Sequence, residues 1–333
     1  MIWDTALTRT FGTRLPIVAG GLQWLADAPY VSAAAHAGII GFVTAASFAT
    51  HDDLRAEIRK TRARCGDLPF GVNVSMLPKL VADDQTEDIF RLIADEGVRF
   101  IETSGRNPEP YIPLLKDLGF TILHKVPAVK YARKAQAVGV DMVSIVGAEC
   151  GGHPGMELIG SFVNAAMAGQ DIKIPFLIGG GVGHGSQLVA ALSMGAAGVI
   201  MGTRLLVAEE LTAHRDYKQA LVDASEGDTA LTMGSVRNTI RTLANETTAE
   251  VARMEAETPN ITIRDLLPLV SGQIGRKAYE TGDVSRGMLS AGHALGLTDK
   301  IEPMADIIDR IEAQALTGYG HLSGAMRQQE AAE

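Results

Sequence analysis

The fold is decided by residues 175–203, which read PFLIGGGVGHGSQLVAALSMGAAGVIMGT. A short apolar run, PFLIGGG, leads through a glycine-rich turn into the amphipathic segment SQLVAALSMGA, and a second apolar run, GVIMGT, follows. Strand, helix and strand in this order predict a parallel β-α-β unit, because parallel strands need a crossover connection. Both runs are apolar throughout, which is typical of parallel strands buried on both faces.

The same unit recurs through the first two-thirds of the chain. Six earlier apolar runs are separated mostly by amphipathic segments, and the starts of successive runs lie roughly 20–33 residues apart. They are LPIVAG from Leu15, IIGFVTA from Ile39, PFGVNV from Pro69, VRFIETS from Val98, TILHKV from Thr121 and MVSIVG from Met142. Eight such repeats predict an α/β fold, the (β/α)₈ TIM barrel. A doubly wound sheet is the alternative, but AGG of the first run lacks the G-x-G-x-x-G spacing of a dinucleotide-binding turn.

Composition narrows the class of protein. The 333 residues are 46% hydrophobic and 21% charged, as in globular proteins, and a net charge of −9 argues against a nucleic-acid partner. Two cysteines, Cys65 and Cys150, cannot form a disulfide framework. No signal-peptide pattern and no membrane-spanning apolar window is found, so we expect a cytoplasmic protein without a membrane span. The histidines show no metal-ligand spacing, and no metal site is expected.

The chain changes character after Leu206. Residues 207–282 hold charged helical segments without convincing buried strands, and we expect a helical substrate or lid domain there. Residues 1–206 are expected to form the barrel, which the segment 283–320 completes with a closing helix, ADIIDRIEAQAL. Residues 321–333 are expected to be a flexible tail. The sequence does not specify an oligomeric state.

Two glycine clusters predict a phosphate site. Barrel enzymes place their active sites at the C-terminal ends of the strands, and the loops after strands seven and eight commonly bind phosphate. Here those loops hold Gly179, Gly180 and Gly181, and then Gly202 and Thr203. Glycines let backbone N–H groups approach an anion, and the helix that begins near residue 185 offers its positive N-terminus. Tight turns without a ligand are the alternative.

The most unusual stretch is GAECGGHPG, residues 147–155, after the sixth run. His153 stands there among glycines at the expected catalytic face, and an imidazole that titrates near neutrality can serve as acid, base or hydrogen-bond donor. Cys150 and Glu149 in the same loop are interpreted as a packed thiol and a backbone-capping carboxylate.

Two further strand ends carry polar side chains. Lys125 follows the fifth run, and a lysine at the end of a buried strand is costly unless it meets an anion. We interpret it as a cation that faces negative charge on a cofactor, with a position on the rim as the alternative. Asn73 has an amide able to bond the donor and acceptor edges of a ring. His124 should point the other way along its strand, towards the helices, and is interpreted as structural.

From about Thr8 to Ala315 the chain resembles the nitronate monooxygenase (2-nitropropane dioxygenase-like) superfamily of FMN-dependent barrels. The motifs are PIVAGGLQW, PFGVNV, HKVPAVKYARKAQAVGVD, GAECGGHPG, IGGGVGHGSQLVAALSMGAAGVIMGTRLL and LVSGQIGRKAYETGDVSRGMLSAG. Inosine-monophosphate dehydrogenases share a pattern like GGG…GAAGVIMGT, but Cys150 does not stand in their nucleophile motif. FGVNVSMLP, ETSGRNPEP and HKVPAVKYARKA look most like the NADH:quinone reductase branch.

The resemblance implies FMN as cofactor, a helical second domain over the flavin, and NAD(P)H as a co-substrate whose hydride passes by way of FMN to a quinone. The alternatives are a nitronate monooxygenase that uses O₂, an enoyl-CoA or acyl-CoA oxidoreductase, and, in a different class, a non-catalytic flavin-binding protein. The resemblance implies catalytic roles for His153 and Lys125. It implies cofactor contacts at Gly20, Gly21, Leu22, Asn73, Lys125, Asp141, Gly151, Gly152, Gly179, Gly180, Gly181, Gly202, Thr203, Ser290 and Gly292. Leu22 stands where relatives often have methionine.

Overall fold

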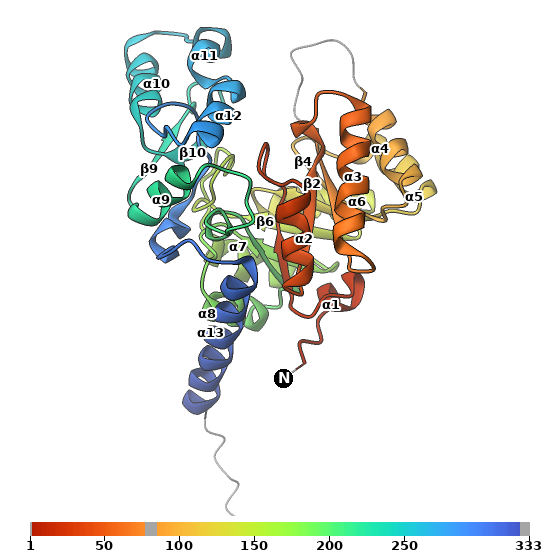
Figure 1. Ribbon diagram of the computed structural model, residues 1–333. Coiled ribbons are helices and arrows are strands. Elements are labelled where there is room, and N and C mark those ends of the chain that lie inside the picture. The colour runs from red at the N-terminus through yellow and green to blue at the C-terminus, as the bar shows by residue number, and fades with distance from the viewer. Residues whose placement is uncertain (1, 77–84, 327–333) are drawn as a thin grey trace, which may run out of the picture.

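The protein forms a closed barrel of eight parallel strands, as the apolar runs predict (Figure 1). The computed structural model describes residues 2–76 and 85–326. The strands are β1 Ile17–Ala19, β2 Ile40–Thr44, β3 Gly71–Ser75, β4 Phe100–Ser104, β5 Thr121–Val126, β6 Met142–Val146, β7 Phe176–Gly179 and β8 Gly198–Met201. Strand β1 pairs with both β2 and β8, which closes the ring and leaves no free strand edge.

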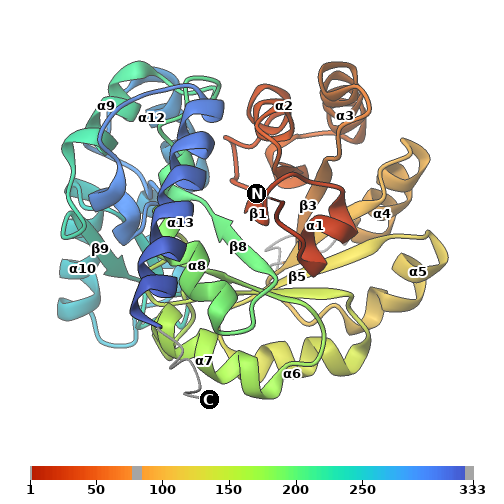
Figure 2. The ribbon, with the colours of Figure 1, turned by 90° about the horizontal axis from the view of Figure 1, so that it is seen from below.

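Helices surround the barrel, and Figure 2 shows them arranged around it from below. They are α2 Ala28–His36, α3 His51–Cys65, α4 Thr86–Asp95, α5 Ile112–Asp117, α6 Val129–Val138, α7 Ser161–Asp171 and α8 Gly185–Ser193. A short helix, α1 Ala6–Phe11, lies under the barrel. Its Leu7 and Phe11 side chains pack with Val18, Phe42 and Leu123 of the barrel interior. The lower end of the barrel is therefore an apolar plug, and its polar interior side chains gather at the other end.

The 207–282 segment lies beside the barrel mouth and contains a β-hairpin that its sequence does not suggest (Figure 1). Its helices are α9 Arg215–Asp223, α10 Glu246–Glu257, α11 Ile263–Val270 and α12 Gly272–Thr281. Strands β9 Thr229–Thr232 and β10 Ile240–Leu243 pair antiparallel. The expectation of a segment without convincing buried strands misses this hairpin, because its strands are four residues long and apolar at only half of their positions. They are too short for a sequence pattern with period two to stand out.

The C-terminal helix α13, Met304–Ala325, packs against α8 and α2. It contains the expected closing helix but continues to Ala325, so residues 321–325 are helical and not the expected flexible tail; residues 327–333 lie outside the described part. A buried ion pair ties this end to the barrel, since Arg204 donates to Glu302 over 2.9 Å and neither side chain is more than 5% exposed. Within the described ranges, no helix is long and apolar enough to cross a membrane.

Candidate active site

A buried carboxylate, Glu102 of β4, organises one half of the barrel mouth. Its Oε2 accepts hydrogen bonds from Asn73 Nδ2 over 2.5 Å and from the Gly21 N–H over 3.2 Å. Its Oε1 lies 3.1 Å from Lys125 Nζ. Three residues with predicted roles at the ends of β1, β3 and β5 therefore meet at the side chain of Glu102, for which the sequence predicts no role. The anion that the buried-strand lysine requires is supplied by the protein itself.

Close packing explains the glycine at position 21. A Cβ atom there would lie 2.5 Å from Asn73 Cβ and 3.0 Å from Thr44 Oγ1, so any other residue would displace the amide. Thr44 ends β2, is buried, and its hydroxyl has no hydrogen-bond partner in the described structure. A buried hydroxyl without a partner is costly, so this atom marks a place for a polar ligand group.

The loops after β7 and β8 have the backbone geometry expected of an anion site. Gly180 and Gly181 have φ values of +90° and +72°, which favour glycine. The N–H groups of Gly180, Gly181 and Gly202 donate no hydrogen bond to the described residues. Helix α8 begins just beyond, where the His184 ring caps it by accepting from the Ser186 N–H. Donors without acceptors beside a helix N-terminus fit a phosphate group.

The β6 loop, residues 147–155, packs directly on residues 290–292. These three residues form the returning segment, which leads from residues 207–282 back to the barrel. A Cβ on Gly151 would lie within 2.9 Å of three backbone atoms of Ala291, so glycine is required for this approach. The Gly292 N–H donates to Thr203 Oγ1 over 2.9 Å, which links the returning segment to the β8 loop as well. Ser290 pairs with Thr242 of β10 in an isolated bridge. The residues implied as cofactor contacts in these three segments are thus brought together.

His153 is exposed at the rim of this loop, and its ring makes no hydrogen bond to the described residues. The surrounding protein partly desolvates the imidazole and lowers its pKa below 6.5. The loop is held from outside by Arg241 of β10, whose backbone N–H and C=O both bond to Gly152, over 2.7 and 2.9 Å. The Arg241 side chain adds a bond from Nε to the Ala148 carbonyl. Desolvation therefore favours the neutral, proton-accepting form of His153, and the loop that carries it is anchored.

Three residues interpreted as structural have structural contacts. Glu149 accepts from the N–H of Ser161 at the start of α7. Burial raises the pKa of the Cys150 thiol to about 12, which leaves it inert at neutral pH. His124 is buried and pairs with Thr103 over 2.8 Å, and its desolvation lowers its pKa to about 4.

Asp141 lies away from the mouth, and its expected cofactor contact is wrong. It directly precedes β6, so it stands at the N-terminal end of the barrel. Its carboxylate accepts from Lys116 Nζ over 2.5 Å and from the Ile122 N–H over 2.8 Å. A residue that follows a helix and precedes a strand belongs to the face that serves stability in this fold. Leu22, by contrast, lies at the mouth, with its side chain next to Gly202.

Glu102 and Arg241 belong to the site although neither is expected there from the sequence. Glu102 stands in a buried strand, and a charged residue inside a buried strand is a signal that it needs partners. Arg241 carries no comparable signal, because its strand pairs with the β6 loop only through the tertiary fold.

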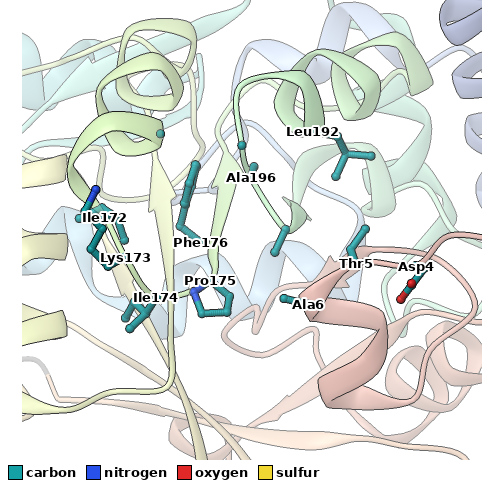
Figure 3. Close-up of a pocket in the computed structure, with 13 residues that line it drawn as sticks. Asp4, Thr5, Ala6, Ile172, Lys173, Ile174, Pro175, Phe176, Leu192 and Ala196 are labelled. Atoms are coloured by element: carbon teal, nitrogen blue, oxygen red, sulfur yellow. The ribbon is translucent and has the colours of Figure 1, made fainter.

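A groove lies at the opposite end of the barrel (Figure 3). Its volume is about 580 Å³, and segments around α1, β7 and β8 line it. The lining is mainly apolar, with Asp4 and Lys173 as its ionisable side chains. Catalysis in this fold takes place at the other face, so we do not place the site here. Across the described part of the chain, no cluster of three or more His, Cys, Asp or Glu side chains is arranged to hold a metal ion.

Known proteins with similar sequences and structures are oxidoreductases. The family described as nitronate monooxygenase matches residues 4–314. The chain is 31% identical to the (3aS,4S,5R,7aS)-5-hydroxy-7a-methyl-1-oxo-octahydro-1H-indene-4-carboxyl-CoA dehydrogenase of Mycobacterium tuberculosis, over 94% of this chain and 96% of that protein. Its structure is similar to FabK from Thermotoga maritima, with a TM-score of 0.87, 30% identity, and coverage of 97% and 99% of the two chains. It is also similar to nitroalkane oxidase from Streptomyces ansochromogenes, with a TM-score of 0.81, 25% identity, and coverage of 96% and 100%.

Proposed function

The chain belongs to the nitronate monooxygenase family and is an oxidoreductase, and we propose that it uses FMN to dehydrogenate the carboxyl-CoA thioester of a small alicyclic acid. Two features support the cofactor. The N–H groups of Gly180, Gly181 and Gly202 have no acceptors in the described structure and suit its phosphate. The unpartnered Thr44 hydroxyl beside Asn73 suits a polar ring edge.

The environment of the His153 ring decides our choice among the reactions of this family. The imidazole is exposed at the mouth and has no partner in the described structure, and partial desolvation lowers the pKa of the ring. Such a group is a general base at neutral pH. A nitronate is already deprotonated, and a hydride donor such as NADH needs no base. The α-carbon of a thioester does need one, because its proton must be removed.

The proposed step forms a carbon–carbon double bond next to the thioester. The α-hydrogen leaves as a proton to the His153 ring, and the β-hydrogen leaves with its electron pair. The bound flavin supplies the capacity to accept that hydride. The protein's part is to keep His153 neutral and to anchor its loop through Arg241, so that the base is held in position.

A second candidate is NAD(P)H:quinone reduction, which FGVNVSMLP and ETSGRNPEP of the sequence favour. In that reaction His153 donates a hydrogen bond to the substrate rather than accepting a proton. The similarity to nitroalkane oxidase keeps nitronate oxidation as a third reaction to test.

The experiment is anaerobic mixing of the purified protein with four separate donors. Before it, heat release and mass measurement of the ligand establish whether FMN is bound. Cyclohexanecarboxyl-CoA, NADH, NADPH and propionate 3-nitronate are then added one at a time while flavin absorbance is followed. We expect the thioester to bleach the flavin fastest, with formation of the unsaturated thioester. Faster bleaching by NADH or NADPH makes the protein a quinone-type reductase, and faster bleaching by the nitronate makes it a monooxygenase. No bleaching by any donor indicates a flavin-binding protein without catalysis.

A further inference from the structure

Glu102 is fully buried, and the three groups that contact its carboxylate are all hydrogen-bond donors. The Gly21 N–H and Asn73 Nδ2 converge on Oε2, and Lys125 Nζ approaches Oε1. A protonated carboxyl would need an acceptor for its own proton, and the three groups that bond to this carboxylate are all donors. The arrangement fits the ionised form, which accepts at both oxygens.

The lysine partner lies nearer to solvent than the carboxylate. The side chain of Lys125 is 22% exposed and that of Glu102 is 0% exposed, so the positive member of the pair is the one that reaches the mouth. The carboxylate lies behind it and compensates most of its charge. A ligand bound in the mouth therefore experiences the dipole of this ion pair, with its positive end nearest, and not a full positive charge.

We propose that Glu102 is the positioning residue of this half of the site: it fixes Asn73, Lys125 and the Gly21 backbone together, and it sets the net charge that they present to the cofactor. The part that concerns the cofactor rests on the proposed function. Glu102 itself touches no ligand in this proposal and acts through its three donors.

Two substitutions of the pair have opposite electrostatic consequences. Glu102→Gln keeps an acceptor for Asn73 but removes the negative charge, so Lys125 presents a full positive charge to the mouth. Lys125→Met leaves the carboxylate uncompensated, so the mouth becomes negative. A positive charge favours the more negative, reduced form of a bound flavin and a negative charge disfavours it.

The test measures the reduction potential of FMN in the wild type and in both variants. Thr103→Val is the control, because Thr103 is equally buried on β4 but faces outward to His124. We expect Glu102→Gln to raise, and Lys125→Met to lower, the ratio of affinities for reduced and oxidised FMN by about tenfold, an order of magnitude for one charge at partly screened distance. Thr103→Val should leave the ratio unchanged. Shifts in the same direction, or no shift in either variant, overturn the proposal.

A second arm needs no cofactor. In the FMN-free protein, Lys125→Met buries an unpaired carboxylate, whereas in Glu102→Gln the partly exposed lysine can turn to water. We therefore expect Lys125→Met to lower the thermal midpoint more than the Glu102→Gln/Lys125→Met double variant does. A double variant less stable than Lys125→Met overturns the positioning role. If the wild type binds no FMN, the proposed function is wrong, but the comparison of thermal midpoints still tests the positioning role of Glu102.

Discussion

Gly151→Ala is expected to separate the returning segment from the β6 loop by steric overlap alone. The φ angle of Gly151 is not positive, so alanine fits its backbone conformation without strain. The new Cβ, however, would lie 2.8 Å from the carbonyl carbon of Ala291 and 2.9 Å from its Cα and N. These are backbone atoms, which cannot rotate away as a side chain can.

The magnitude follows from the two ways in which the structure can respond. If the overlap is kept, overpacking costs about 1–3 kcal/mol. If the segment moves away, it loses the bonds from the Gly292 N–H to Thr203 and from the His293 N–H to the Glu149 carbonyl. At about 1 kcal/mol for each bond, this route costs about 2 kcal/mol. Both routes therefore predict a loss of about 2 kcal/mol in the free energy of unfolding.

Urea unfolding and FMN titration by fluorescence check this expectation. Gly160→Ala is the matched control: it lies in the same region, at the start of α7, and its Cβ would meet Glu149 at an acceptable 3.4 Å. We expect Gly151→Ala to lose about 2 kcal/mol of stability and to bind FMN more weakly, and Gly160→Ala, at the N-cap of α7, to lose at most about 1 kcal/mol and to keep its FMN affinity. Equal FMN affinities in the two variants would refute the idea that this contact shapes the site.

Three further outcomes are expected. His153→Asn should lower turnover by about 10²–10⁴-fold with FMN retained, and wild-type turnover should fall as the pH drops below the lowered pKa of His153, where the base becomes protonated; full activity in the variant argues against a role. Gly180→Leu should abolish FMN retention, since its Cβ would lie 2.8 Å from the Gly147 nitrogen and its φ is +90°; a fully loaded variant contradicts the phosphate site. Arg204→Met should cost about 1–3 kcal/mol in urea unfolding, because it removes the most deeply buried of three cations that pair with Glu302 while Lys300 and Arg310 remain; no measurable loss would show that these two cations suffice.

The barrel was predictable because its signal is repeated and local. Each strand is an apolar run, and most are followed by a helix whose period differs from that of a strand. The glycine-rich loops after β7 and β8 could be located for a related reason, since each cluster directly follows an apolar run in the sequence. His153 and Lys125 were found because polar residues at strand ends in a barrel all face the same mouth.

Contacts between distant segments were not predictable in the same way. The hydrogen bond between the Gly21 N–H and Glu102 joins residues that are 81 positions apart. The sequence of neither strand indicates that these two residues are in contact. Arg241 bonds to Gly152 through backbone atoms, which carry no sequence signature. Asp141 shows the opposite case: it ends the motif HKVPAVKYARKAQAVGVD that carries the family resemblance, but its place before β6 puts it at the other end of the barrel. Strand direction would have excluded it.

The two halves of the mouth are stabilised by different interactions, and this difference predicts the effect of substitutions in each half. Around β3, β4 and β5 the site depends on side-chain charges gathered by Glu102. Around β6, β7 and β8 it depends on backbone approach at glycines such as Gly151 and Gly180, where an added methyl group meets main-chain atoms. Substitutions in the first half should therefore change the energy of the cofactor's redox states, and substitutions in the second half should change whether the cofactor is held at all. His153 extends from the second half, so its base strength depends on a loop anchored by backbone bonds and is largely independent of the charged half.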